Sequence, residues 1–272
     1  MNERSLPLQP KDKRSQSQQD FLNRELLHRR RVKVTRIMAA VLFLALWELA
    51  ASFGWIDSFI FSSPSMIVLC LIGMIQDGSL FLHTGVTLLE TLVSFFLVVS
   101  LGLITALLLW FCRSLAEILE PFLVMLNSLP KSALAPLLIV WLGNNMNTII
   151  VAAVSVALFG SILTLYTGFS TLDQDQVKLI YSLGGSKRDV LFKVLLPGSL
   201  PMIVNNMKVN IGLCLVGVII GEFLSSRAGL GYLITYGSQT FAMTMVVTSI
   251  VILCLLSVVL YQLIALFENR VK

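Results

Sequence analysis

Three long stretches of the chain contain no Asp, Glu, Lys or Arg. They run for 41 residues from Ser132 to Leu172, for 40 from Ala228 to Phe267, and for 22 from Thr91 to Cys112. An α-helix rises about 1.5 Å per residue, so about 20 apolar residues cross a bilayer. Only 13% of the 272 residues are charged, whereas soluble domains carry about 25%. The runs therefore predict an all-α membrane protein.

Polar breaks divide the apolar sequence into six spans. The cluster from Gly143 to Asn147 divides the longest run, and Gly54 and Arg113 mark other ends. Residues 65–76 are apolar but too few to cross, so we expect an interfacial helix there. Within a transmembrane domain of residues 35–268, the expected spans are 35–54, 84–110, 119–141, 148–168, 203–223 and 243–266.

Basic residues collect on one side of these spans. Ten of the 20 Lys and Arg lie in residues 1–36, so we expect 1–34 to be a basic segment ahead of the first span. With six spans, 17 Lys and Arg fall on the side of the N-terminus, and only Arg227 falls on the other. The positive-inside rule then predicts that both termini and the loop 169–202 are cytoplasmic, in a multi-pass protein of the cell membrane. This distribution indicates contact with lipid and argues against a nucleic-acid partner.

Motifs of catalysis and metal binding are absent from the sequence. It contains no G-x-x-x-x-G-K-[ST], no H-E-x-x-H and no G-x-S-x-G. Two histidines are too few for a multi-His metal site, and the four cysteines form no C-x-x-C pair. We therefore expect no catalytic residue, no metal and no cofactor in this chain.

The loop 169–202 is the one substantial polar insertion between spans. Two helical stretches flank Gly184 and Gly185, and Pro197 and Pro201 are expected to end the second stretch before the fifth span. On the first stretch, Val177, Ile180, Tyr181 and Gly184 share one apolar face. The residues alone leave two interpretations open, a helix lying on the lipid surface and a docking surface for another protein.

Several motifs occur in a fixed order along the chain. One is in the loop, where Leu183, Gly184, Gly185 and Ser186 are followed by Pro197, and the others are Phe61-Ser-Ser-Pro-Ser65, Leu129 to Gly143, Gly221-Glu-Phe and Gly229 to Ile234. Together they resemble binding-protein-dependent ABC importer permeases, in particular the nitrate/sulfonate/taurine-type branch, and the loop motif is similar to the cytoplasmic signature of that family. Two positions depart from the family pattern: Lys178-Leu179-Ile180 stands where the family has E-A-A, and Glu90 lies where a basic residue is common.

The resemblance implies a MetI-like permease fold of six transmembrane helices. It implies that the chain works with a second permease subunit, as a homodimer, that an external solute-binding protein delivers the substrate, and that a dimer of cytoplasmic ABC ATPases hydrolyses ATP. It also implies that the loop is a coupling helix that docks on the ATPase. The residues assigned to coupling are Val177, Ile180, Tyr181, Leu183, Gly184, Gly185, Ser186 and Pro197.

Charged residues in or beside the spans need a reason, because an intramembrane charge costs about 2.5–3.5 kcal/mol. Lys131 lies in the third expected span between Pro130 and Pro136, which loosen a helix and free backbone carbonyls. Two interpretations are open for Lys131: it lines the pathway and attracts an anion, or it pairs structurally with Glu90 or a carbonyl. Glu222 is expected to pair or to reach the interface.

The sequence thus predicts the permease subunit of an importer for a small solute such as a sulfonate or a nitrate-like anion, and not an enzyme. The alternatives are a self-sufficient secondary transporter, a membrane-embedded enzyme and a membrane scaffold that transports nothing. A secondary transporter needs groups for a coupling ion at the bilayer midplane, and only Lys131 is clearly placed there.

Overall fold

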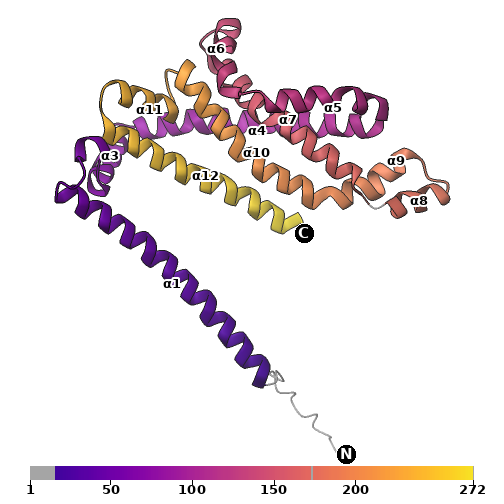
Figure 1. Cartoon of the computed structure of the whole chain (residues 1–272), viewed down its shortest axis with the longest axis horizontal. Coiled ribbons are helices and arrows are strands. Elements are labelled where there is room, and N and C mark those ends of the chain that lie inside the picture. The colour runs from indigo at the N-terminus through magenta and orange to yellow at the C-terminus, as the bar shows by residue number, and fades with distance from the viewer. Residues whose placement is uncertain (1–15, 173, 272) are drawn as a thin grey trace, which may run out of the picture. The chain divides into compact units, whose positions relative to one another are not determined.

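The apolar runs of the sequence form long helices (Figure 1). The computed structural model describes residues 16–172 and 174–271, and the regular elements in these ranges are helical, without a β-strand. The elements are α1 (Gln16–Ser52), α2 (Ser58–Phe61), α3 (Pro64–Gln76), α4 (Ser79–Phe111), α5 (Arg113–Ser128), α6 (Lys131–Leu142), α7 (Met146–Ser170), α8 (Gln174–Ser182), α9 (Lys187–Val190), the π-helix η1 (Leu191–Leu195), α10 (Leu196–Ser225), α11 (Leu230–Gln239) and α12 (Met243–Val271).

Residues 1–58 and 59–272 form two structural units. In the first unit, the stretch Arg30–Ser52 of α1 is long and apolar enough to cross a membrane. Its apolar side chains, among them Met38 and Phe43, are exposed, as lipid-facing side chains would be. Of the expected basic segment, residues 1–15 lie outside the described residues, and residues 16–34 form the beginning of α1.

The second unit contains four further helices that can cross a membrane by length and composition. They are α4, α7, the stretch Lys187–Ser225 that includes α10, and the stretch Met243–Leu266 of α12. A sixth span results if α5 and α6 are counted as one bent span. The all-helical membrane fold expected from the sequence is confirmed, and α3 is the short apolar helix that the sequence predicts between the first two spans.

The segment expected as one span over 119–141 is two helices that meet at 94°. The break lies at Leu129 and Pro130, which are both extended, with ψ angles of 139° and 98°. Proline disfavours the helical conformation of the residue before it and has no N–H to continue the helix. Pro121 and Pro136 lie inside α5 and α6 and do not divide them.

The expectation that Pro197 and Pro201 end a helix before the fifth span is wrong. Residues 187–225 form continuous helical structure, in which η1 links α9 to α10. Pro197 lies in the first turn of α10 and Pro201 inside it. The wider π turn of η1 ends two residues before Pro197, and such turns, although rare, are frequently found at functional sites. As a result, α9 is joined to the long helix α10 without a flexible break.

Helix α7 lies between α4 and α10 at the centre of the second unit (Figure 1). Phe95, Val98, Ala157, Ile211 and Cys214 form a buried cluster from these three helices. A sixth member, Leu260, comes from α12. Helices α3 and α11 lie at one end of this unit, and α8 and α9 lie at the other (Figure 1).

Small residues allow α7 and α10 to approach closely. A Cβ atom at Gly217 would lie 2.5 Å from Ala153 Cα, and one at Gly221 would lie 3.0 Å from Ile149 Cα. Gly217 and Gly221 form the G-x-x-x-G pattern of α10, a spacing typical of close helix pairs in membranes. This pattern therefore packs against α7 of the same chain.

Candidate functional site

Two glycines make the turn between α8 and α9. Gly184 has a φ of +79°, a left-handed conformation that side chains with a Cβ rarely adopt. The amide of Gly184 donates to the Tyr181 carbonyl at 3.0 Å, and that of Gly185 donates to the Ile180 carbonyl at 2.9 Å. These bonds close the end of α8 in the manner of a glycine cap. A Cβ at Gly185 would lie 2.8 Å from the Ile180 carbonyl oxygen, so this position also requires glycine.

Helix α9 begins with a reciprocal cap. The Ser186 amide donates to Asp189 Oδ2 at 2.8 Å, and the Asp189 amide donates to Ser186 Oγ at 3.4 Å. This capping box satisfies two amides that the first turn of a helix leaves without partners. Asp189 also pairs with Lys193 at 2.9 Å. The turn of Gly184 and Gly185 is therefore fixed on both sides by backbone hydrogen bonds.

The second half of the loop is buried against the bundle. Val190 and Leu195 are fully buried, and Leu191 nearly so. Leu191 and Leu195 pack in a cluster with Ala106 of α4 and with Leu165 and Phe169 of α7. These buried side chains attach α9 and η1 to the ends of α4 and α7.

Lys187 ties α9 to the end of α4. Its Nζ donates to the Phe111 carbonyl at 2.7 Å and lies 5.2 Å from the centre of the Trp110 ring. The contact combines a charge-assisted hydrogen bond with a cation–π interaction. It holds the N-terminus of α9 at one position relative to α4.

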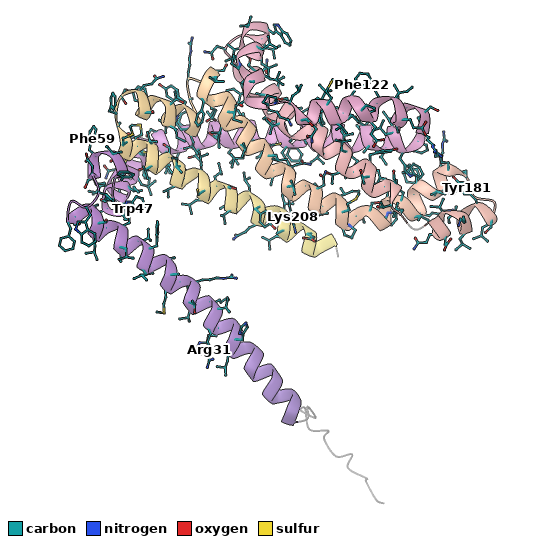
Figure 2. All side chains as sticks on the ribbon, viewed as in Figure 1. Arg31, Trp47, Phe59, Phe122, Tyr181 and Lys208 are labelled. Carbon is teal, nitrogen blue, oxygen red and sulfur yellow. The ribbon has the colours of Figure 1, made fainter. Side chains whose placement is uncertain are left out.

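Four apolar side chains of the loop point outward, three of them around the end of α8 and one in η1. Leu183 is 76% exposed, and Leu179, Tyr181 and Phe192 are also exposed. We call these four residues the loop patch; Tyr181 marks its place at the tip of the bundle in Figure 2. Leu179 of α8 and Leu183, immediately after its end, are one helical turn apart, and the Leu183 amide donates to the Leu179 carbonyl at 3.1 Å.

The structure distributes the predicted coupling residues differently from the expected face. Val177 and Ile180 are half-buried, while Tyr181, Leu183 and Gly184 are exposed. Sequence reasoning missed Leu179 and Phe192, although the spacing of Leu179 and Leu183 was visible as an i, i+4 pair. Ser186 and Pro197 are also exposed, the first as the cap of α9 and the second in the first turn of α10.

A cavity of about 570 Å³ lies beside the loop. Val177 and Lys187 line it from the loop, and Trp110 and Tyr166 line it from α4 and α7. Arg113, Glu117 and Glu120 contribute charged groups from α5, and the first two form an exposed ion pair at 2.9 Å. Across the described residues, no group of three or more His, Cys, Asp or Glu is placed to hold a metal ion.

Lys131 is the first residue of α6, immediately after the bend. Its half-buried ammonium donates to the Asn127 carbonyl, which the break at Pro130 leaves free of a helical partner. This contact corresponds to the second interpretation of Lys131, in which the ammonium pairs structurally with a backbone carbonyl. Pro130 precedes α6 as its cap residue and Pro136 lies within it, and both are exposed.

Glu90 is not paired with Lys131 but with Glu222. The two carboxyl groups interact side chain to side chain between α4 and α10. Glu222 also accepts hydrogen bonds from Thr87 Oγ1 at 2.7 Å and from the Gly231 amide at 2.5 Å. The sequence singled out both acids as unusual in spans, but 131 residues separate them and nothing local predicts their contact.

These features define a membrane protein with several spans and a helical loop that is packed against the bundle and carries exposed apolar side chains. The family model described as "Binding-protein-dependent transport system inner membrane component" matches residues 98–272, and the chain belongs to this family. Members of the family are membrane permease subunits of ABC transporters and are not themselves enzymes, so the resemblance inferred from the loop motifs is confirmed.

Three curated relatives match most of the chain. A probable ABC transporter permease protein of Haemophilus influenzae is 32% identical over 80% of this chain and 88% of its own. The formylaminopyrimidine transport permease protein ThiX of Halalkalibacterium halodurans is 25% identical over 84% and 91%. The putative aliphatic sulfonates transport permease protein SsuC of Escherichia coli is 30% identical over 78% and 81%. The expected likeness to sulfonate permeases is therefore confirmed.

A solved structure shares the fold. A chain of the methionine ABC transporter MetNI, in an inward-facing conformation, matches with a TM-score of 0.62 and 20% identity. The match covers 77% of this chain and 99% of that chain. The MetI-like permease fold implied by the loop motifs is thereby confirmed.

Proposed function

We propose that this chain forms the translocation pathway of an ATP-driven importer and is coupled to a separate ATPase through the loop 169–202. The observation that carries the proposal is the loop patch. Its apolar side chains are exposed, while Leu191 and Leu195 of the same loop are buried against α4 and α7. Exposed apolar surface on an otherwise ordered loop is typical of a protein interface.

The attachment of the loop suits the transmission of force. Helix α9 continues through η1 into α10, and Lys187 joins it to α4. Since α10 and α4 both pack against α7, a displacement of the loop by a closing ATPase would move these helices together. A flexible tether would absorb such a displacement, which is why the fixed turn at Gly184 and Gly185 supports coupling.

The proposal includes a topology and a set of partners. With 17 basic residues on one side and one on the other, both termini and the loop patch face the cytoplasm. An external binding protein delivers the solute on the opposite side, and a second copy of the chain completes the pathway. Residues 35–268 are the transmembrane domain, and residues 1–34 are its basic cytoplasmic segment.

The substrate class is a small polar or anionic organic solute. The relatives' names cover both aliphatic sulfonates and formylaminopyrimidine, so the likeness supports a class and not one compound. Within the pathway, Pro130 and Pro136 shape the bent α5–α6 segment, and Lys131 stabilises the bend through the Asn127 carbonyl.

A substitution in the loop patch tests the function. We expect Leu183→Asp to abolish copurification of the cognate ATPase in detergent and to stop ATP-dependent uptake, because a charge replaces an exposed apolar contact. Phe241→Asp is the matched control: Phe241 is also exposed, lies between α11 and α12 at the other end of the unit, and has a φ of 56° that Asp tolerates. Retention of the ATPase by Leu183→Asp would refute coupling through this loop.

Reconstitution separates the alternative functions. An importer should take up solute in liposomes only with the ATPase, ATP and the binding protein present. Uptake by the chain alone under an ion gradient would instead establish a secondary transporter, and turnover of a compound without any ATPase would establish an enzyme. A protein that binds its partners but moves nothing would be a scaffold.

A further inference from the structure

Two carboxyl groups meet in the interior of the second unit. Glu90 of α4 is 2% exposed, Glu222 of α10 is 1% exposed, and their side chains hydrogen-bond to one another. They are the two fully buried carboxyl side chains among the described residues. A hydrogen bond between two carboxyl groups needs a proton, because ionised carboxylates offer only acceptors.

Glu222 has the environment of the ionised partner. Thr87 donates to Oε1, and the Gly231 amide donates to Oε2. This amide belongs to the first turn of α11, where the helix dipole also favours a negative charge. A Cβ at Gly229 or Gly231 would collide with the carboxyl group, so these glycines bring the backbone close enough to donate.

Glu90 has the environment of the neutral partner. Its Oε2 is buried and has no hydrogen-bond partner. Burial without a hydrogen-bond partner is costly for an ionised carboxylate oxygen, because a buried charge needs partners for its lone pairs. The same burial costs much less for the carbonyl oxygen of a neutral carboxylic acid. The difference between the two sites identifies Glu90 as the residue that carries the proton and donates to Glu222.

No basic side chain balances the pair within the described part of the chain. The nearest titratable group on α4 is His83, whose Nδ1 accepts from the Gly229 amide at 3.0 Å. On α10, Lys208 is paired with Glu268.

Of the basic residues on the other packed elements, Lys131 of α6 donates to the Asn127 carbonyl and Arg113 of α5 pairs with Glu117. Helix α7 carries no charged residue, and neither does α12 from Met243 to Leu266. Helix α11 contributes only Tyr232 and Tyr236, and Arg227, in the segment before it, is exposed. With no basic side chain paired to either carboxyl group, a bound proton is what prevents two negative charges from meeting at the site.

We propose that Glu90 and Glu222 form a proton-binding site that holds one proton within the membrane domain and thereby keeps α11 docked against α4 and α10. Glu90 carries the proton and donates it in a hydrogen bond to Glu222. The inference does not depend on transport, on the ATPase or on the identity of the solute.

A consequence follows for the dependence of stability on pH. In the unfolded chain both carboxyl groups are ionised at neutral pH, so folding binds one proton. Stability contributed by the site is therefore present at low pH and is lost as the pH rises far enough to remove the shared proton. Loss of that proton leaves two adjacent buried charges and loosens α11.

Infrared spectroscopy detects the proton directly. The full-length protein is purified in dodecyl maltoside, which has no ester carbonyl, with and without isotope-labelled glutamate. We expect a carbonyl band of a buried carboxylic acid at neutral pH that shifts with the glutamate label, is lost in Glu90→Gln and persists in Glu120→Gln. Glu120 is an exposed acid and serves as the control. Absence of the band from the wild-type protein overturns the proposal, even if Glu90→Gln fails to fold.

Thermal unfolding at increasing pH gives an independent test. Gln at position 90 can still donate to Glu222 but carries no titratable proton, so Glu90→Gln should lose less melting temperature than the wild type between neutral and alkaline pH. Glu120→Gln should follow the wild type. Equal losses of melting temperature in the wild type and in Glu90→Gln would show that proton binding at this site does not contribute to stability.

Discussion

At the scale of single residues, the turn of Gly184 and Gly185 makes different demands at adjacent positions. Gly184 needs a left-handed backbone but has open space where a methyl group would lie, whereas Gly185 lacks space beside the Ile180 carbonyl. The first demand is conformational and the second is steric. Both follow from one function of the turn, which is to end α8 and begin α9 within a few residues.

Substitutions at these glycines should therefore differ in kind. Gly184→Ala should destabilise the loop by about 1–2 kcal/mol, the cost of a left-handed L residue, and Gly184→Asn should cost less because Asn tolerates this conformation. Gly185→Ala should cost more than Gly184→Asn, since the methyl group meets backbone 2.8 Å away. Protease accessibility of the loop and ATPase stimulation measure these effects. Equal behaviour of Gly184→Ala and Gly184→Asn would contradict the conformational argument.

Local sequence was sufficient for this turn and insufficient for the acid pair. Gly184, Gly185 and Ser186 are contiguous, so their cap and turn chemistry can be predicted without tertiary structure. Glu90 and Glu222 could be recognised only as unusual charges in spans. Their contact depends on how α4 and α10 pack, and hydrophobic periodicity carries no information about that pairing.

At the scale of helices, the bend between α5 and α6 is the feature that apolar length alone did not predict. A run without charges measures how many residues can lie in a bilayer, not whether they form one helix. Pro130 was visible in the sequence, but Pro121, Pro136 and Pro201 were visible too and divide no helix. The extended conformations of Leu129 and Pro130 distinguish this break from the other three prolines, which lie inside helices.

Replacement of Pro130 tests the origin of the bend. Spin labels at the exposed positions Phe122 and Val140 report the distance between α5 and α6. We expect Pro130→Ala to shift this distance distribution to longer values, because Leu129 regains access to the helical conformation and residue 130 regains an N–H. The control Pro136→Ala removes a proline inside α6 and should leave the distribution unchanged. An unchanged bend in Pro130→Ala would assign it to tertiary packing instead.

At the scale of the whole molecule, α7 connects the loop 169–202 to the membrane-spanning helices. It contacts α4, α10, α5 and α6, and it supplies Leu165 and Phe169 to the cluster that holds the loop. The sequence predicted a span over 148–168, which lies within α7, whereas the spacing of Gly217 and Gly221 by itself is compatible with an internal contact or with a contact to a second subunit. The structure assigns Gly217 and Gly221 to the internal contact with α7.

The α7–α10 contact should therefore control the stability of each subunit more than its association with a second copy. A methyl group at Gly217 would lie 2.5 Å from Ala153 Cα, so Gly217→Ala must push the two backbones apart, at about 1–3 kcal/mol for an overpacked interior. Gly212→Ala, on the same helix, meets nothing within 4 Å and serves as the control. Thermal unfolding in detergent should show a lower melting temperature for Gly217→Ala alone. If Gly217→Ala instead weakened subunit association at unchanged melting temperature, the glycine pattern would belong to the interface between copies.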